Sequence, residues 1–294
     1  MSAVASARVK SRRDPVSVAL KVWGVLVYVF LFLPILVIVI YSFNNGRSIL
    51  TFDGFGLNGY RTGTTDPTII DAVKTSIVAA TGTALIATIL GSCAGIALAR
   101  RKGKWTLPFL ALVFLILVTP EIVVAIALLI WYVRLGGPFG PTMAIPAVSY
   151  GMLRLWVGHS LFATAVVALI VRARLAGIEE TLEEAAADLY ASPWRRFRQI
   201  MLPLMLPAVL AGALLAFSFS LDDTIISSFV SVAGSSPWPV YVFSAVRNAL
   251  RPEVASISTL LLLLTLFAIA CVALVLRRGG RSSEEVAKTM TGAG

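Results

Sequence analysis

Charged residues are scarce in this chain. Asp, Glu, Lys and Arg together make up 14% of its 294 residues, whereas soluble globular domains carry about 25%. Hydrophobic residues make up 58%, and the mean hydropathy is +0.88. A water-soluble domain has no interior large enough for so much apolar surface, so the composition predicts an integral membrane protein.

Cysteine and histidine are nearly absent as well. The chain has two cysteines and one histidine, and Cys93 and Cys271 lie far apart inside separate apolar runs. Neither a disulfide framework nor a metal cluster is indicated by so few residues. We therefore expect no metal, and we interpret His159 as a packing residue rather than a ligand.

A nucleotide-binding signature is also missing. The phosphate-binding pattern Gly-x-x-x-x-Gly-Lys-Ser/Thr does not occur, and the nearest fragment, residues 103–105, lacks both the leading glycine and the hydroxyl. We expect this chain to bind neither ATP nor magnesium by that route, to hold no cofactor and to be no enzyme.

What the chain does have is a series of apolar segments of membrane-spanning character. They cover residues 22–41, 72–99, 106–133, 157–171, 204–232 and 254–276. We predict an all-α integral membrane protein with six transmembrane helices over residues 22–276 and with short tails at 1–21 and 277–294. Pro146 and Gly151 are expected to separate a short helix from the fourth span.

The basic residues indicate how these helices are oriented. If the amino terminus is cytoplasmic, 18 of the 25 Lys and Arg residues lie on the cytoplasmic side. Five are in the amino-terminal tail, four follow the second span, five flank the loop at 173–203, and four are near the carboxy terminus. Cytoplasmic loops carry such an excess of positive charge. We therefore expect both termini and this loop in the cytoplasm, and no nucleic-acid partner.

The longest polar interruption, residues 173–203, carries the local signals of two short helices. Thr181 followed by Glu184 matches a capping box and predicts a helix start. Ser192 before Pro193 predicts a second start, and the proline that closes the segment is expected to end that second helix. The first helix has an apolar stripe that requires a partner. The stripe is formed by Leu182, Ala185, Ala186 and Leu189.

The same segment resembles the EAA loop of ABC-importer permeases. In that family Glu-Ala-Ala is followed after three residues by Gly and, nine residues later, by Ile-x-Leu-Pro. The matching positions are Glu184, Ala185, Ala186, Tyr190, Ile200, Leu202 and Pro203. The resemblance implies a MetI-like ABC importer transmembrane domain whose loop, with Thr181 and Asp188, docks on a separate ATPase. Tyr190 replaces the usual Gly, and because a left-handed tyrosine is costly we expect the bend at residues 191–193.

Three acidic residues lie inside the apolar segments: Glu121, Asp222 and Asp223. A carboxylate between apolar helices is expensive unless it faces water or a partner, so each acid marks a functional site. In a regular helix Asp223 lies on a polar arc that lines a pathway, whereas Asp222 points toward a neighbouring helix. The other residues of the arc are Ser220, Thr224, Ser227 and Ser231. The pathway is therefore expected to accept a cation.

Aromatic rings would add faces for ammonium groups or methylene chains to such a pathway. The candidates are Tyr150, Trp156, Trp131 and Tyr132. Four further stretches, residues 41–44, 120–123, 220–223 and 227–230, resemble the permease of spermidine/putrescine ABC importers, the PotC type. The similarity extends over most of the chain.

The resemblance implies a permease subunit of the bacterial inner membrane. It would pair with a second permease, recruit an ATPase dimer that carries ATP and magnesium, and receive a polyamine from an extracytoplasmic binding protein. Two alternatives remain open: a different small solute, and a proton-coupled secondary transporter with Glu121 and Asp223 as proton sites. No obvious inverted repeat supports the second alternative, which also leaves the docking segment without a role.

Overall fold

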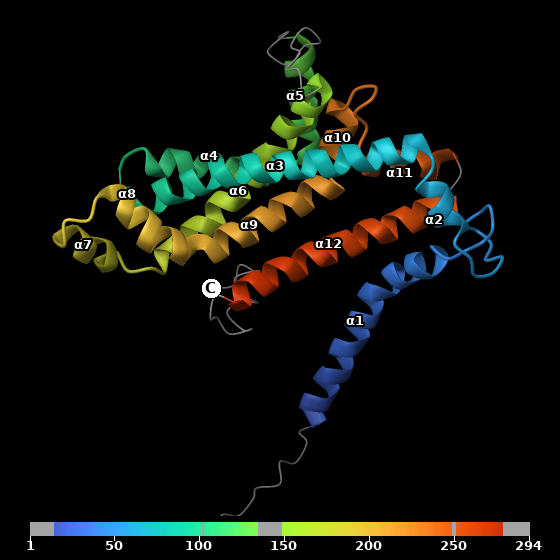
Figure 1. The fold of residues 1–294 in the computed structure, drawn as a ribbon, viewed down its shortest axis with the longest axis horizontal. Helices are drawn as coiled ribbons and strands as arrows, with labels where there is room; N and C mark the ends of the chain where they lie inside the picture. Colours follow the sequence, from blue (N-terminus) through green and yellow to red (C-terminus); the bar gives the residue numbers. More distant parts are fainter. Residues whose placement is uncertain (1–14, 102, 135–148, 249–250, 279–294) are drawn as a thin grey trace, which may run out of the picture.

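The computed structural model describes residues 15–101, 103–134, 149–248 and 251–278. These residues form helices and connecting loops without a named strand, which confirms the all-α class (Figure 1). Five helices are long and apolar enough to cross a membrane, and a sixth span is counted if one sharply bent helix pair crosses as a unit. The predicted number of six spans agrees with the higher of these two counts.

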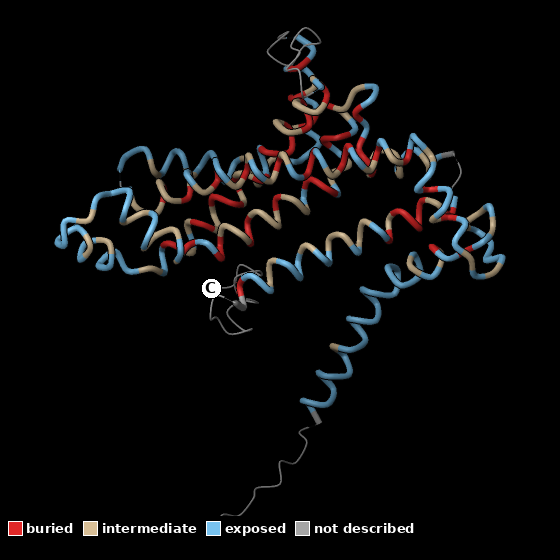
Figure 2. Tube along the Cα trace, viewed as in Figure 1, coloured by how far each residue is buried: buried red, intermediate tan, exposed pale blue. Residues whose placement is uncertain are grey.

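The scaffold is a layer of three long helices, α3 (Pro67–Arg100), α6 (Tyr150–Ala176) and α9 (Leu202–Asp222), which lie side by side (Figure 1). Glycines allow α3 and α6 to approach closely, as small residues do in membrane helix pairs. A Cβ atom at Gly95 would stand 2.7 Å from the Ala168 carbonyl oxygen. Many of the chain's buried residues lie where these three helices face one another (Figure 2).

The expected third span is not one helix. It consists of α4 (Thr106–Val118) and α5 (Glu121–Arg134), which are bent by 102° relative to each other. Pro120 cannot donate a backbone hydrogen bond and restricts the residue before it to extended conformations. Thr119 has ψ 127°, as this restriction requires. Pro120 therefore breaks the span completely and places Glu121 at the start of a new helix.

The fourth span begins earlier than expected. Ser149 caps α6 by accepting a hydrogen bond from the Met152 amide, so the helix is continuous from Tyr150 and does not start near 157. Gly151 does not break it, because the glycine serves close packing: a Cβ atom there would stand 2.7 Å from a methyl group of Val232. The short helix expected before residue 149 lies outside the described residues.

The fifth span is broken near its end. Helix α9 stops at Asp222, Asp223 has an extended backbone with φ −61° and ψ 112°, and α10 (Ile225–Val230) follows. Helix α11 (Trp238–Asn248) and the sixth span, α12 (Pro252–Arg278), complete the described chain. The regular helix assumed for residues 204–232 is therefore wrong, and with it the facing assigned to Asp222.

Helix α1 (Pro15–Tyr41) diverges from the layer (Figure 1). None of its most apolar 18 residues is buried, and only 11% of the corresponding window of α12 is buried. The short helix α2 (Asn58–Gly63) packs near the start of α12, where Ser256 Oγ donates to the Ser42 carbonyl at 2.7 Å. Figure 2 shows α1 as the most exposed of the helices, so its apolar surface must be covered by lipid or protein.

The polar segment forms α7 (Thr181–Asp188) and α8 (Pro193–Arg196), as expected for two short helices. The prediction of a capping box at Thr181 is wrong. Glu180 is already helical at the cap position, and the Thr181 hydroxyl donates to the Glu179 carboxylate at 3.2 Å. The second cap is confirmed, since Ser192 Oγ accepts from the Arg195 amide.

The proline that closes the segment does not end a helix. One π-helical turn, η1 (Phe197–Met201), joins α8 directly to α9, and Pro203 lies in the first turn of α9. The wider π-helical turn, in which the Leu202 amide bonds to the Phe197 carbonyl five residues back, accommodates the amide that Pro203 lacks. The docking segment is therefore continuous with the fifth span.

The bend of the polar segment lies at Tyr190 and not at residues 191–193. Tyr190 has φ 59°, which is the left-handed conformation that glycine adopts at low cost and other residues rarely adopt. Its amide donates to the Ala187 carbonyl at 2.9 Å, and the Ala191 amide donates to the Ala186 carbonyl at 3.0 Å. These two bonds form a Schellman motif, so the helix-ending geometry is kept although the residue is a tyrosine.

Candidate functional site

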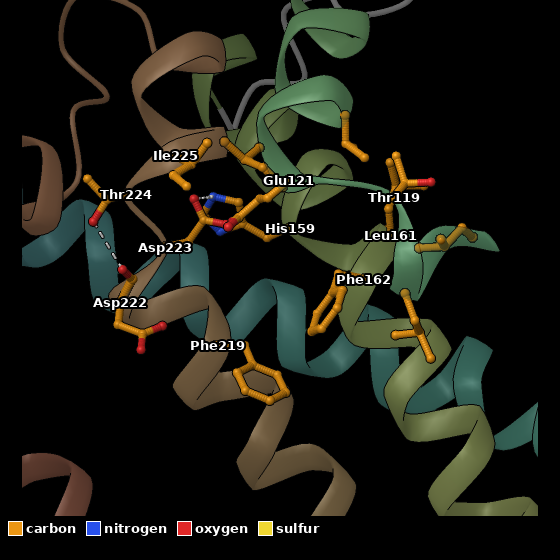
Figure 3. Close-up of a pocket in the computed structure, with 14 residues that line it drawn as sticks. Thr119, Glu121, His159, Leu161, Phe162, Phe219, Asp222, Asp223, Thr224 and Ile225 are labelled. Carbon is orange, nitrogen blue, oxygen red and sulfur yellow. Dashed lines mark hydrogen bonds and ion pairs between the residues drawn. The ribbon is translucent and has the colours of Figure 1, made fainter. Parts of the chain in front are cut away.

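The acidic residues of the membrane segments meet at one cavity of about 600 Å³. It lies where the α4–α5 break faces α6 and the α9–α10 break. Figure 3 shows Glu121, Asp223 and His159 close together on its wall, with Asp222 and Thr224 beside them. The two helix breaks therefore bring side chains from sequence positions about a hundred residues apart to a common site.

Glu121 and Asp223 form the centre of this wall. Their carboxyl groups lie side by side on the wall and are close enough to interact electrostatically (Figure 3). Glu121 is exposed at the first residue of α5, whereas the Asp223 side chain is only 8% exposed. Two carboxylates this close repel each other. The pair is therefore stable only if it shares a proton or binds another cation. The pair is therefore a place where positive charge is stabilised.

The backbone orients Asp223. Because its residue is extended between the two helices, one carboxylate oxygen accepts the Ser227 amide at 3.0 Å. Asp222, the last residue of α9, is exposed and reaches both this cavity and a neighbouring one of about 440 Å³ bordered by α11 and α12. Of the two roles open to Asp222, a structural contact with a neighbouring helix or a place on the pathway, its position on both cavity walls favours the second.

The predicted polar arc is divided between two environments. Thr224 lines the cavity and donates its hydroxyl to the Asp222 carbonyl at 3.2 Å. Ser220 and Ser227 are buried instead, and both hydroxyls contact the ring of His159. The lone histidine, which the sequence suggested was mere packing, is thus a hydrogen-bonded member of the wall. The sequence signal that could have indicated this role is the position of the histidine between two small residues, Gly158 and Ser160.

The aromatic surface of the cavity comes from residues that the sequence did not single out. Phe162 and Phe219 line it, with their rings in a T-shaped arrangement at 5.5 Å. The expected rings are used elsewhere: Trp156 donates to the Val78 carbonyl at 3.0 Å, and Tyr132 donates to the Arg154 carbonyl at 3.0 Å. Phenylalanine is too common in membrane helices to be recognised from sequence as a cavity residue.

The composition of the wall limits what the cavity can hold. Among the described residues that line it there are three carboxylates and no Lys or Arg. The same described part of the chain contains no cluster of three or more His, Cys, Asp or Glu suited to a metal ion. Apolar side chains complete the wall. The arrangement suits an organic cation with charged ends and an apolar middle.

The segment that resembles the EAA loop is almost entirely exposed. No residue of α7, α8 or η1 is buried. Of the predicted docking residues, Thr181, Glu184, Ala185, Asp188, Tyr190 and Pro203 are exposed, and Ala186, Ile200 and Leu202 are half-buried. Large apolar side chains also point outward, including Leu189, Tyr190 and Trp194, which are 82%, 97% and 67% exposed. This apolar surface needs a protein partner.

Arg100, which the sequence analysis counted only as a basic residue, ties this segment to the scaffold. Its Nε donates to Glu183 of α7 at 2.9 Å, and its terminal nitrogens donate to the carbonyls of Leu175 and Ile178. The side chain is 13% exposed. The end of α3 is therefore fixed both to the end of α6 and to the first turn of α7.

Known proteins resemble this chain over most of its length. Residues 87–281 match the family described as binding-protein-dependent transport system inner membrane component. The putrescine transport system permease protein PotI of Escherichia coli (strain K12) is 37% identical over 236 residues, which cover 80% of this chain and 82% of PotI. The spermidine/putrescine transport system permease protein PotC of Haemophilus influenzae is 34% identical, covering 86% and 94%.

Solved structures agree on the fold. A chain of a bacterial alginate ABC transporter, solved with an alginate pentasaccharide-bound periplasmic protein, has a TM-score of 0.69 at 12% identity and covers 89% of this chain and 94% of its own. A chain of the MetNI methionine ABC transporter has a TM-score of 0.60 at 16% identity, with coverage of 74% and 100%. The protein belongs to the family of binding-protein-dependent transport system inner membrane components.

Proposed function

We propose that this chain is a permease subunit of an ATP-driven importer and forms half of a membrane pathway for putrescine or spermidine. The observation that carries the proposal is the pairing of Glu121 with Asp223 on the wall of a cavity within the membrane layer. The names of the relatives PotI and PotC support the same cargo.

The physical argument concerns the hydration of the cargo. A polyamine carries its positive charges on a chain of methylenes, and it can leave water for a low-dielectric cavity only if fixed carboxylates replace the lost hydration. Glu121, Asp222 and Asp223 supply those carboxylates. The rings of Phe162 and Phe219 supply an apolar surface for the methylenes and faces for ammonium groups.

A second permease is part of the proposal because the site is open on one side. Glu121 and Asp222 are exposed in the single chain, although both lie in segments that are apolar enough to cross the membrane. Charged groups that face lipid are strongly disfavoured. We therefore infer that a similar subunit covers the cavity and that the pathway runs between the two chains, while α1 and α12 offer further apolar surface for that contact.

The other partners follow from the polar segment and the family. The exposed apolar stripe of α7 and the side chains of Tyr190 and Trp194 are proposed to contact an ABC ATPase dimer on the cytoplasmic side. ATP and magnesium are expected on that partner. An extracytoplasmic binding protein would deliver the cargo from the opposite face, with both termini of this chain in the cytoplasm, as the distribution of basic residues favours.

Another cargo has one specific observation in its favour. A putative 2-aminoethylphosphonate transport system permease protein, PhnV of Salmonella typhimurium, is 27% identical over 88% of this chain. 2-Aminoethylphosphonate carries a phosphonate anion beside its single ammonium group, however, and no Lys or Arg is among the described cavity-lining residues to pair with that anion. Electrostatics therefore favours a polyamine over a phosphonate.

The proposal is tested by transport in proteoliposomes. The chain is purified together with an ABC ATPase, a second permease and a binding protein from the same genome, and uptake of labelled putrescine is measured. We expect uptake that requires ATP and the binding protein and that spermidine, but not 2-aminoethylphosphonate, inhibits. ATP-driven uptake of a different solute without polyamine uptake contradicts the cargo, and polyamine uptake driven by a pH gradient without ATP contradicts the importer class.

A further inference from the structure

His159 occupies an unusual position beside the cavity. It lies on α6, its residue is 4% exposed, and both of its ring nitrogens have partners. Nδ1 lies 2.7 Å from Ser220 Oγ, and Nε2 lies 3.0 Å from Ser227 Oγ. A neutral imidazole has one donor and one acceptor nitrogen, and a serine hydroxyl can match either. The ring therefore bridges two hydroxyls without leaving a nitrogen unpaired.

The two serines lie on opposite sides of a helix break. Ser220 belongs to the last turn of α9 and Ser227 to α10, while Asp223 between them is extended. The regular helical hydrogen bonds are interrupted at that point, so the backbone alone does not fix the distance between the two helices. The imidazole of a third helix supplies a bridge across the gap.

The same bridge reaches the cargo-binding acid. Asp223 accepts the amide of Ser227 at 3.0 Å, and one of its carboxylate oxygens lies 3.6 Å from His159 Nε2. Figure 3 shows the imidazole directly beside the Asp223 carboxylate and Glu121. Any displacement of α10 relative to α9 would therefore turn the Asp223 carboxylate relative to Glu121.

We propose that His159 is a positioning residue: by joining Ser220 to Ser227 across the broken fifth span, it holds the Asp223 carboxylate in the cavity opposite Glu121. This inference rests on the proposed transport function. A ring of the same size without nitrogens would fill the volume but leave two buried hydroxyls unpaired and remove the polar link between α9 and α10, although α10 would still pack against α5 and α6. The role thus requires the nitrogens as well as the volume.

Amide side chains separate the two contacts. The amide of Gln extends to about the position of Nε2, on the Ser227 side, whereas the amide of Asn reaches only the Nδ1 side. We expect His159→Gln, which keeps only the Ser227 contact, to lower putrescine uptake about threefold when uptake is normalised to assembled complex. His159→Asn should lose about tenfold, mainly through a higher KM, because Asp223 is no longer held in place.

A double-mutant cycle distinguishes positioning from general stability. Asp223→Asn is expected to reduce uptake about tenfold, and adding His159→Asn to it should cost less than a further twofold, because the group that the histidine positions is already gone. Two independent losses that multiply would overturn the positioning role. If Asp223→Asn alone leaves uptake unchanged, the proposed pathway itself fails, and the inference falls with it.

A serine pair gives a second test that leaves the histidine intact. Ser227→Ala removes the hydroxyl that contacts Nε2 and should raise the KM for putrescine by about fivefold. Ser228→Ala is the matched control, because Ser228 is exposed on the same helix and its hydroxyl bonds only to the Thr224 carbonyl. Equal KM values for the two variants would contradict the bridge even if a histidine variant failed to assemble.

Discussion

The polar segment around α7 and α8 and the acidic cavity are built in opposite ways. No residue of α7 or α8 is buried, and the bonds that shape the ends of these helices join neighbours, such as the Ser192 cap and the Schellman motif at Tyr190. The cavity combines α5, α6, α9 and α10, and its hydrogen bonds join residues 61 and 68 positions apart. The first region keeps its shape locally, whereas the second depends on the whole membrane layer.

The difference suggests how the two regions divide the work of transport. A locally stable segment can present a fixed surface to a partner while the helices behind it move. A cavity assembled from broken helices changes its geometry when those helices shift. Arg100 joins the regions, because it fixes α7 to the ends of α3 and α6. We infer that a displacement of the polar segment is passed to the cavity through these long helices and through η1.

The largest expected effect comes from a substitution on the exposed surface of α7 that leaves the membrane-spanning helices unchanged. Ala185→Glu places a charge in the apolar stripe of α7 between Leu182 and Leu189, and a buried unpaired charge is strongly unfavourable in an interface. We expect the ATPase no longer to copurify and putrescine uptake to fall to background. Ala187→Glu is the control, because this alanine is exposed on the opposite side of the helix. Equal loss in both variants would contradict the assigned docking face.

A smaller effect is expected from a substitution that tests whether local backbone conformation shapes the polar segment. Tyr190→Gly should stabilise the bend by about 1 kcal/mol, because a left-handed residue with a Cβ atom is strained and glycine is not. Exchange of the Ala191 amide hydrogen, measured by NMR or mass spectrometry, should slow by roughly fivefold. Tyr190→Ala keeps the strained backbone and should bring no such protection. Identical exchange in the Gly and Ala variants would show that φ 59° carries no strain.

The sequence predicted what depends on composition and on neighbours. The membrane class, the helical fold and the second cap at Ser192 follow from hydropathy and short patterns, and all three are confirmed. The first cap failed because two glutamates precede Thr181: Glu180 already continues the helical backbone, and Glu179 engages the hydroxyl. A capping pattern does not reveal which of several adjacent polar residues starts the helix.

The sequence could not predict the breaks in the third and fifth spans. Pro120 indicated a kink, but the size of the 102° bend depends on how α5 packs against α10. No proline or glycine marks the break at Asp223, so periodicity implied a regular helix there. The role of His159 depends on that break, because Ser220 and Ser227 flank it. The three acids line one cavity wall in the structure, whereas their facing could not be read from the sequence, and their role in transport stays a prediction.

The central claim is that the acids of the cavity bind the positive charges of the cargo. Its most direct test is the uptake of labelled putrescine by Glu121→Gln and Asp223→Asn, each normalised to assembled complex and compared with the Ser228→Ala control. Both substitutions keep the shape of the side chain and remove its charge. Removing one side of a partly buried charge pair costs about 2–5 kcal/mol, so the account predicts at least a tenfold fall with the ATPase still bound. Unchanged uptake in both variants would contradict it.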